Sequence, residues 1–357
     1  MSNDHKAHLL DLDLAELQEF LRSLGESSFR AKQLYQWIYG ALTFDFEQMS
    51  NLPKSVRRRL SESAVVMPLR PVARRVDDNG LTVKTLFELS DGETVESVLM
   101  LYEARQSARA RRTVCVSSQV GCAIGCPFCA TGAAGFVRNL APGEIVAQVL
   151  QYAHDLASGE LGIGKVTNVV FMGQGEPLAN FDNVWKAVLL LNSPYGFSLG
   201  ARHITISTAG LAPGIIELAR RPLQVGLAVS LHAPNDRLRD SLVPVNKAFP
   251  LAKLMSACRQ YVELTNRRVT FEYALIGGVN DSLALARELA RLLSGLLCHV
   301  NLIPLNPTSG DFRRTPRQQT MAFQAELLRR GIPTTIRTER GGHIEAACGQ
   351  LRGVCRP

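Results

Sequence analysis

The stretch Gly121-Cys122-Ala123-Ile124-Gly125-Cys126-Pro127-Phe128-Cys129-Ala130-Thr131-Gly132 holds three cysteines at the spacing C-x3-C-x2-C, with glycines among them. A loop this short brings three thiolates together. A structural zinc ion takes four ligands, usually as two separated cysteine pairs. Cysteine thiolates also hold iron–sulfur clusters, and a four-iron cluster held by three of them keeps one iron open. The spacing therefore predicts a [4Fe-4S] cluster with one iron available to a small molecule.

The composition is that of an ordinary globular chain. It has 357 residues, of which 46% are hydrophobic and 20% charged. This length predicts one large domain accompanied by a smaller one. No apolar run approaches the roughly 18 residues that a membrane-spanning helix needs, and the polar start of the chain lacks the apolar centre of a signal peptide. We therefore expect a cytoplasmic protein without membrane contact.

The charge balance favours a polyanionic partner. The formal net charge is +8, and arginines cluster at positions 57–59, at 74–75 and between 105 and 112, all before Cys115. Each cluster alone is typical of a solvated surface. Three of them in the N-terminal third of the chain favour nucleic acid as the partner.

The eight cysteines favour metal or redox chemistry over a disulfide framework in a chain expected to be cytoplasmic. Cys258 and Cys298 fit core positions. Cys115 lies in or beside a predicted strand, seven residues before Cys122. Cys348 stands among the small residues Ala346, Ala347 and Gly349. It fits either a buried position or a nucleophile that a bulky partner can approach, and the residues alone leave both open.

The N-terminal part predicts helices and then a hairpin. Residues 11–60 carry three helical patterns, with Asp13 as the expected cap of the first and Ser27 or Ser28 of the second. Residues 83–89 and 95–100 predict two strands joined by Ser90-Asp91-Gly92. Glu96 lies in the second strand, and the pattern does not show which face it uses.

From residue 113 onward, strands and helices alternate. Strands are predicted at 113–117, 166–172, 203–207, 226–231, 269–275, 299–304 and 334–337. Helices are predicted at 141–154 and 181–191, after a cap at Asp281 or Ser282, and after a cap at Thr315. This order builds parallel β/α units. The predicted fold is α/β: a partial (β/α)6 barrel at 105–345, a helical accessory domain at 1–65, a β-hairpin extension at 66–104 and a C-terminal segment at 346–357.

Polar and glycine residues follow five of the predicted strands. Their segments are the cysteine loop, Gly173-Gln174-Gly175-Glu176-Pro177, Ser207-Thr208-Ala209-Gly210, Ser230-Leu231-His232-Ala233-Pro234 and Asn306-Pro307. Chemistry gathers at the carboxyl ends of strands in parallel barrels, so these segments predict a cofactor pocket. Beside a cysteine loop, Glu176 is suited to hold the amino group of S-adenosylmethionine (SAM), whose sulfonium would take an electron from the reduced cluster.

These segments together resemble the RlmN/Cfr family of radical SAM RNA methyltransferases. The resemblance rests on Cys115 to Cys122, the cysteine loop, Gly173 to Leu178, Ser230 to Ala233, Ala346 to Leu351, and Phe29-Arg30-Ala31-Lys32-Gln33 in the N-terminal helices. It covers essentially the whole chain and adds the family's radical SAM barrel to the fold prediction. Gln174 stands where the family usually has methionine, and we expect little effect from this loop position.

The resemblance implies a role for each site residue. The cluster ligands are Cys122, Cys126 and Cys129, and the cofactor site is lined by Gly175, Glu176, Ser207, Ser230, Leu231, His232 and Asn306. Cys348 takes a methyl group from one SAM, and a deoxyadenosyl radical from a second SAM removes hydrogen from that S-methyl group. The carbon radical then adds to an adenine ring carbon. Cys115 resolves the resulting protein–RNA tether through a transient disulfide with Cys348, and Glu96 is the proton acceptor.

The resemblance also implies a product and partners. The RlmN branch makes 2-methyladenosine in 23S rRNA and often in the tRNA anticodon loop, whereas the Cfr branch methylates carbon 8. The sequence does not cleanly separate the two branches, and we favour the first because it is the more widespread one. A non-catalytic zinc protein that binds RNA is the alternative from another class. The expected partners are RNA and an electron donor such as flavodoxin or ferredoxin, and the expected state is a monomer.

Overall fold

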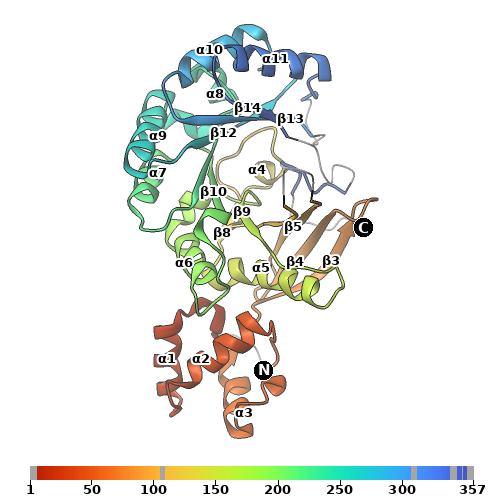
Figure 1. The fold of residues 1–357 in the computed structure, drawn as a ribbon, viewed down its shortest axis with the longest axis vertical. Coiled ribbons are helices and arrows are strands. Elements are labelled where there is room, and N and C mark those ends of the chain that lie inside the picture. The colour runs from red at the N-terminus through yellow and green to blue at the C-terminus, as the bar shows by residue number, and fades with distance from the viewer. Residues whose placement is uncertain (1–5, 105–108, 307–311, 338–343, 348, 352–357) are drawn as a thin grey trace.

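The computed structural model describes residues 6–104, 109–306, 312–337, 344–347 and 349–351. Cys348, Cys355 and Pro307 lie outside this range, as do residues 105–108 of the arginine-rich run, whereas Arg109, Arg111 and Arg112 lie inside it. The described chain is organised around a ten-stranded sheet in the order β14-β13-β12-β11-β10-β9-β6-β5-β4-β3 (Figure 1).

Seven neighbouring strands of this sheet are parallel. They are β6 (Arg111–Cys115), β9 (Asn168–Phe171), β10 (Ile204–Thr208), β11 (Gly226–Ser230), β12 (Val269–Leu275), β13 (Cys298–Pro304) and β14 (Thr334–Ile336). All seven predicted strands are present, with ends shifted by a few residues. In the described residues the edge strands β14 and β3 do not pair with each other, so the barrel is open. The predicted partial barrel is confirmed.

Helices connect and cover the parallel strands (Figure 1). They are α5 (Pro142–Ala157), α6 (Phe181–Asn192), α7 (Ala212–Arg220), α8 (Asp236–Leu242), α9 (Leu251–Thr265), α10 (Leu283–Leu293) and α11 (Arg317–Arg329), with short turns η4 (Pro177–Asn180), η5 (Ala201–His203) and η6 (Pro244–Lys247). Ser282 caps α10 as predicted, since its side chain accepts a hydrogen bond from the Leu285 amide. The predicted Thr315 cap of α11 is wrong: Pro316 is the N-cap residue, and the Thr315 hydroxyl donates to Asp281 instead.

The predicted hairpin continues the barrel sheet. It consists of β4 (Thr82–Leu89) and β5 (Thr94–Tyr102), with β3 (Leu69–Val76) outside it. These strands are antiparallel, and β5 pairs with β6 so that Val98 lies opposite Cys115. Two short strands, β7 (Gln119–Gly121) and β8 (Phe136–Asn139), flank the cysteine loop and the helix α4 (Ala130–Ala134).

The N-terminal helices form a lobe beside the barrel (Figure 1). They are α1 (Leu14–Ser23), α2 (Arg30–Tyr35), the π-helical turn η2 (Gln36–Gly40) and α3 (Lys54–Ser63), with η1 (Leu9–Asp11), η3 (Phe46–Gln48), β1 (Ala7–His8) and β2 (Ala64–Val65). Asp13 caps α1 as predicted, in a reciprocal pair with Glu16. The predicted serine cap of α2 is wrong, because Phe29 is its N-cap residue and makes no side-chain cap bond. One continuous hydrophobic core runs from this lobe into the barrel.

The arginines at 57–59 and 74–75 are not free cationic patches. Each pairs with a carboxylate: Arg57 with Glu47, Arg58 with Glu62, Arg59 with Glu26, Arg74 with Asp155 and Glu160, and Arg75 with Glu345. Much of their charge is therefore balanced locally, and the clusters alone are weaker evidence for a polyanion than their sequence indicated. No helix in the described ranges combines the length and apolar character that a membrane span requires.

Candidate active site

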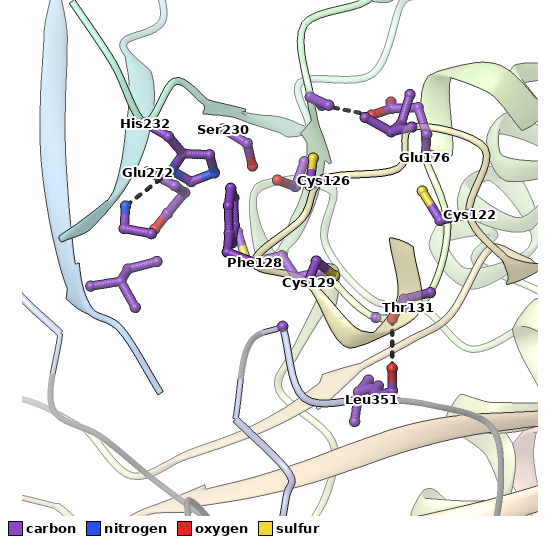
Figure 2. A pocket seen from close by; sticks show the side chains of 18 of the residues that line it. Cys122, Cys126, Phe128, Cys129, Thr131, Glu176, Ser230, His232, Glu272 and Leu351 are labelled. Carbon is purple, nitrogen blue, oxygen red and sulfur yellow. Dashed lines mark hydrogen bonds between the residues drawn. The ribbon is translucent and has the colours of Figure 1, made fainter. Parts of the chain in front are cut away.

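A cavity opens where the parallel strands end. Its lining includes every predicted cluster and cofactor residue except Leu231: Cys122, Cys126, Cys129, Gly175, Glu176, Ser207, Ser230, His232 and Asn306. Leu231 is fully buried, and its amide donates to the Glu272 carbonyl. Figure 2 shows the cysteines and Glu176 with Ser230 and His232 around this space. The strand-end pattern therefore located the cavity from sequence.

Local backbone contacts shape the cysteine loop. The Cys122 amide donates to the Gly135 carbonyl at 2.7 Å, which closes the loop across α4. Gly121 has φ +74°, and a Cβ there would lie 2.0 Å from the Gly135 oxygen, so only glycine fits. All three loop cysteines are free thiols. Burial raises the pKa of Cys122 to about 11 and that of Cys126 further, so bound cations are needed to hold them as thiolates at neutral pH.

The donor set fits a multi-iron group. In the described part of the chain, no three His, Cys, Asp or Glu side chains are grouped as the ligands of a metal ion. The three thiols of one short loop line the wall of a common cavity. Thiolate sulfur is also the usual ligand of iron–sulfur clusters. Cys122, Cys126 and Cys129 are therefore the residues that would hold such a group.

Glu176 offers a buried carboxyl group beside the cysteine loop. Its oxygens accept hydrogen bonds from the amides of Leu178 at 3.0 Å and Ala209 at 2.6 Å. Burial is the main cause that raises its pKa to about 7, against these hydrogen bonds. An ammonium group placed in the cavity would stabilise the charged carboxylate. The site thus fits the amino group of an amino-acid moiety.

His232 joins the end of β11 to the cysteine loop. It has φ +60°, and its Nδ1 accepts the Ala274 amide at 3.0 Å. The ring packs edge-on against Phe128, with centroids 5.1 Å apart (Figure 2). Asn280 donates to the His232 carbonyl and holds the turn. Because burial lowers the pKa of His232 to about 3, the ring is neutral and acts as an acceptor.

Arg239 was not predicted from the sequence. It is on α8, fully buried, and donates to the carbonyls of Ala209, Ser230 and Leu231 at 2.6–3.1 Å. It therefore ties together the ends of β10 and β11. Glu272, Thr131 and Arg337 also line the cavity and were missed. No spacing rule distinguishes these residues in the sequence, since each depends on which elements the fold brings together.

Glu96 and Cys115 lie beside the cavity rather than in its lining. Cys115 belongs to a small apolar cluster with Val98, Met100, Ala346 and Leu351. The Glu96 carboxylate forms an ion pair with Lys84, with Oε1 2.9 Å from Nζ. Gln174 is almost fully buried, and its Oε1 accepts a hydrogen bond from the Glu96 amide. Its side chain is therefore part of the packed structure around Glu96.

The residues on both sides of Cys348 contact the same region. The Gly349 carbonyl accepts the Ala130 amide, and the Leu351 carbonyl accepts the Thr131 hydroxyl, both at 2.7 Å (Figure 2). On the other side, the Glu345 carbonyl accepts a hydrogen bond from Lys84. The C-terminal segment thus bridges β4 and the cysteine loop.

Comparisons with known proteins match almost the whole chain. Residues 7–66 match the family model described as the ribosomal RNA large subunit methyltransferase N-terminal domain, and residues 116–289 match the radical SAM superfamily. The chain is 48% identical to a probable dual-specificity RNA methyltransferase RlmN of Desulforamulus reducens, over 98% of this chain and 97% of that protein. It is 50% identical to the protein of the same name from Chloroflexus aurantiacus, over 97% and 92%.

A solved structure is similar throughout. The crystal structure of a radical SAM methyltransferase from Sphaerobacter thermophilus matches with a TM-score of 0.94 and 52% identity, over 98% of this chain and 100% of that one. The superfamily implies SAM and a [4Fe-4S] cluster, and the cavity holds residues that fit both. The chain therefore belongs to the RlmN family of radical SAM RNA methyltransferases.

Proposed function

We propose that this enzyme makes 2-methyladenosine in 23S rRNA and in the tRNA anticodon loop. The relatives' name, dual-specificity RNA methyltransferase, supports two kinds of RNA substrate. Carbon 2 of adenine carries no acidic hydrogen, so a polar methyl transfer from a sulfonium would fail there. When bound, the cluster and two SAM molecules per turnover supply the methyl group and the radical chemistry that the protein itself lacks.

The observation that carries the proposal is the position of the segment around residue 348. Gly349 and Leu351 are bonded to the cysteine loop, and Ala346 and Leu351 share an apolar cluster with Cys115. These contacts support a site in which Cys115, Cys348 and the cluster ligands work on one substrate. Small neighbours at 346, 347 and 349 leave room for a base to approach the Cys348 sulfur.

The chain's own residues then have separate roles. Cys348 carries the methyl group and becomes bonded through it to the adenine ring. Glu96 accepts the proton from the ring carbon. Cys115 attacks the Cys348 sulfur as a thiolate, so that an S–S bond forms as the bond between Cys348 and the methyl carbon breaks. The electron pair of the broken bond stays with that carbon, which takes up a proton to become the methyl group, and a thiol reductant then reduces the disulfide. Glu176, Ser207, Ser230, His232 and Asn306 hold SAM in the cavity that they line. The main chain at Leu231 is held by β12 and Arg239.

The partners follow from the same proposal. We propose the helical lobe at 1–65 as the part that contacts RNA, with 66–104, 105–345 and 346–357 as the other units. A flavodoxin or ferredoxin reduces the cluster, and the enzyme acts as a cytoplasmic monomer.

The test is mass spectrometry of digested rRNA and tRNA after incubation with the anaerobically reconstituted enzyme, SAM and a reductant. We expect 2-methyladenosine from both RNAs. Methylation at carbon 8 would replace the proposed product with the Cfr-type one, and unmodified RNA would refute the proposal.

The two cysteines outside the loop give a second test. Because each cysteine acts at a different stage, Cys348→Ala is expected to abolish methyl transfer. Cys115→Ala should leave protein covalently bound to RNA on a denaturing gel, and two variants that match the wild type would exclude the two-cysteine mechanism.

A further inference from the structure

We propose that Lys84 is a positioning residue, which holds the Glu96 carboxylate in place through an ion pair and ties it to the segment that carries Cys348. This inference rests on the proposed function, in which Glu96 is the proton acceptor. Lys84 lies on β4, outside both the cysteine loop and the cavity lining. Three contacts and one shared face of the sheet support this role of Lys84.

The first contact is the ion pair itself. In the β4–β5 ladder Lys84 is opposite Val98, and Leu86 is opposite Glu96, so Lys84 and Glu96 are diagonal neighbours on one face. Nζ lies 2.9 Å from Oε1, and the two side chains are only 8% and 5% exposed. Both charges are therefore shielded from water and depend on each other.

The same face is covered by the C-terminal segment. Val98 and Met100 share the face of β5 with Glu96, because alternate residues of a strand point the same way. Both pack with Ala346, Leu351 and Cys115. The Lys84–Glu96 pair therefore lies at the edge of the apolar cluster in which Cys115 meets the neighbours of Cys348.

The second and third contacts hold the segment directly. Lys84 Nζ donates to the Glu345 carbonyl at 3.2 Å, and Arg75 on β3 lies 3.6 Å from the Glu345 carboxylate. Glu345 has φ +54°, a conformation that is unfavourable for a glutamate and persists only where surrounding contacts enforce it. One ammonium group thus holds the proposed base and the backbone three residues before Cys348.

The charge of Lys84 matters as well as its position. An ion pair holds the carboxylate oxygen in a fixed position, and a proton acceptor must lie within hydrogen-bond reach of the proton that it takes. Lys84 on β4 supplies that pair at 2.9 Å, and the Gln174 side chain, from the loop after β9, accepts the Glu96 amide. The unpaired electron that radical addition leaves on the ring would pass to a bound cluster. In the step itself, the proton moves from the ring carbon to Glu96, the C–H electron pair stays in the ring, and Lys84 keeps its protons.

The test compares Lys84→Gln, Lys84→Arg and the matched control Lys253→Gln on the reconstituted enzyme. Glutamine keeps hydrogen-bond donors but loses the charge, arginine keeps the charge, and Lys253 is exposed on α9. Two quantities are measured: the fraction of protein bound covalently to RNA and the S-methyl content of Cys348.

We expect Lys84→Gln to accumulate the protein–RNA adduct at least several-fold above wild type while Cys348 is still methylated. Lys84→Arg should lower the adduct to the wild-type level, because it keeps the charge that pairs with Glu96, and Lys253→Gln should match the wild type throughout. Lys84→Met, which keeps the unbranched stem, replaces the glutamine variant if that variant does not fold.

Two results would overturn the role of Lys84. One is a folded charge-free variant that resolves the adduct at the wild-type rate. The other is a variant that loses Cys348 methylation and turnover together without accumulating adduct, which indicates a purely structural role. Failure of the proposed function is distinct, because the wild type itself would then yield no methylated adenosine.

Discussion

His232 makes the stability of the folded chain depend on pH. Its pKa is 6.5 as a free side chain and about 3 in the folded protein, because burial disfavours the charged ring. Below pH 6.5 the unfolded chain binds a proton that the folded chain does not, so the free energy of unfolding falls as the pH falls. The loss from this group approaches about 1.4 kcal/mol per pH unit and ends near pH 3.

His232→Asn tests this dependence. Asparagine tolerates the left-handed backbone and keeps an acceptor for the Ala274 amide, but it does not titrate. Urea unfolding of the metal-free chain at pH 7 and pH 5.5 should show a loss that is about 1 kcal/mol smaller in the variant than in the wild type. An equal loss in both proteins would mean that His232 does not carry this pH dependence.

At the scale of elements, Arg239 on α8 holds the ends of β10 and β11 in place. The guanidinium binds three main-chain carbonyls at the ends of β10 and β11, and Glu176 binds the amide of one of them, Ala209. Hydrogen bonds to a charged group contribute about 1.5–3 kcal/mol each. The position of Ser230 in the cavity lining therefore depends on a side chain that does not line the cavity.

Arg239→Met is expected to weaken SAM binding roughly tenfold, which corresponds to about 1.4 kcal/mol, and to lower the unfolding temperature. Both effects follow from freeing the strand ends and leaving buried carbonyls unpaired. SAM titration of the reconstituted enzyme and thermal unfolding measure them. The matched control is Arg237→Met, an exposed arginine on the same helix. Equal SAM affinity in the two variants would show that Arg239 does not position the residues that line the cavity.

At the scale of elements, some features could be predicted from the sequence and others could not. The parallel strands and the polar segments after them were predictable, because local hydrophobic runs and turn residues mark them. The pairing of β5 with β6 was not, because register between strands far apart in the chain leaves no local pattern. Thr315 illustrates the same limit of sequence-based prediction. Its local pattern indicates a helix cap, but in the structure its hydroxyl donates to the distant Asp281 instead.

Across the whole molecule, the site is assembled from distant segments. Lys84 and Glu96 come from the antiparallel strands, the three loop cysteines from the segment between β7 and α4, and Gly349 and Leu351 from the C-terminal segment. The N-terminal lobe joins this assembly at the start of α5. There, Asp11 accepts the Gly143 amide at 2.7 Å, and Lys186 on α6 reaches Glu16 at 2.8 Å.

Gly143 permits the close packing of the N-terminal lobe against the start of α5. A Cβ on Gly143 would lie 2.9–3.0 Å from atoms of Asp11 and Leu10, whereas one on Gly40 would meet nothing within 4 Å. Alanine is the better helix former by about 1 kcal/mol, but two of the three close contacts are with backbone, which cannot rotate away. We therefore expect Gly143→Ala to loosen the lobe, with faster proteolysis between α3 and β3 and weaker RNA binding, while SAM affinity stays unchanged. Gly40→Ala is the control, and a Gly143→Ala protein as resistant to protease as this control would show that the lobe tolerates the added methyl group.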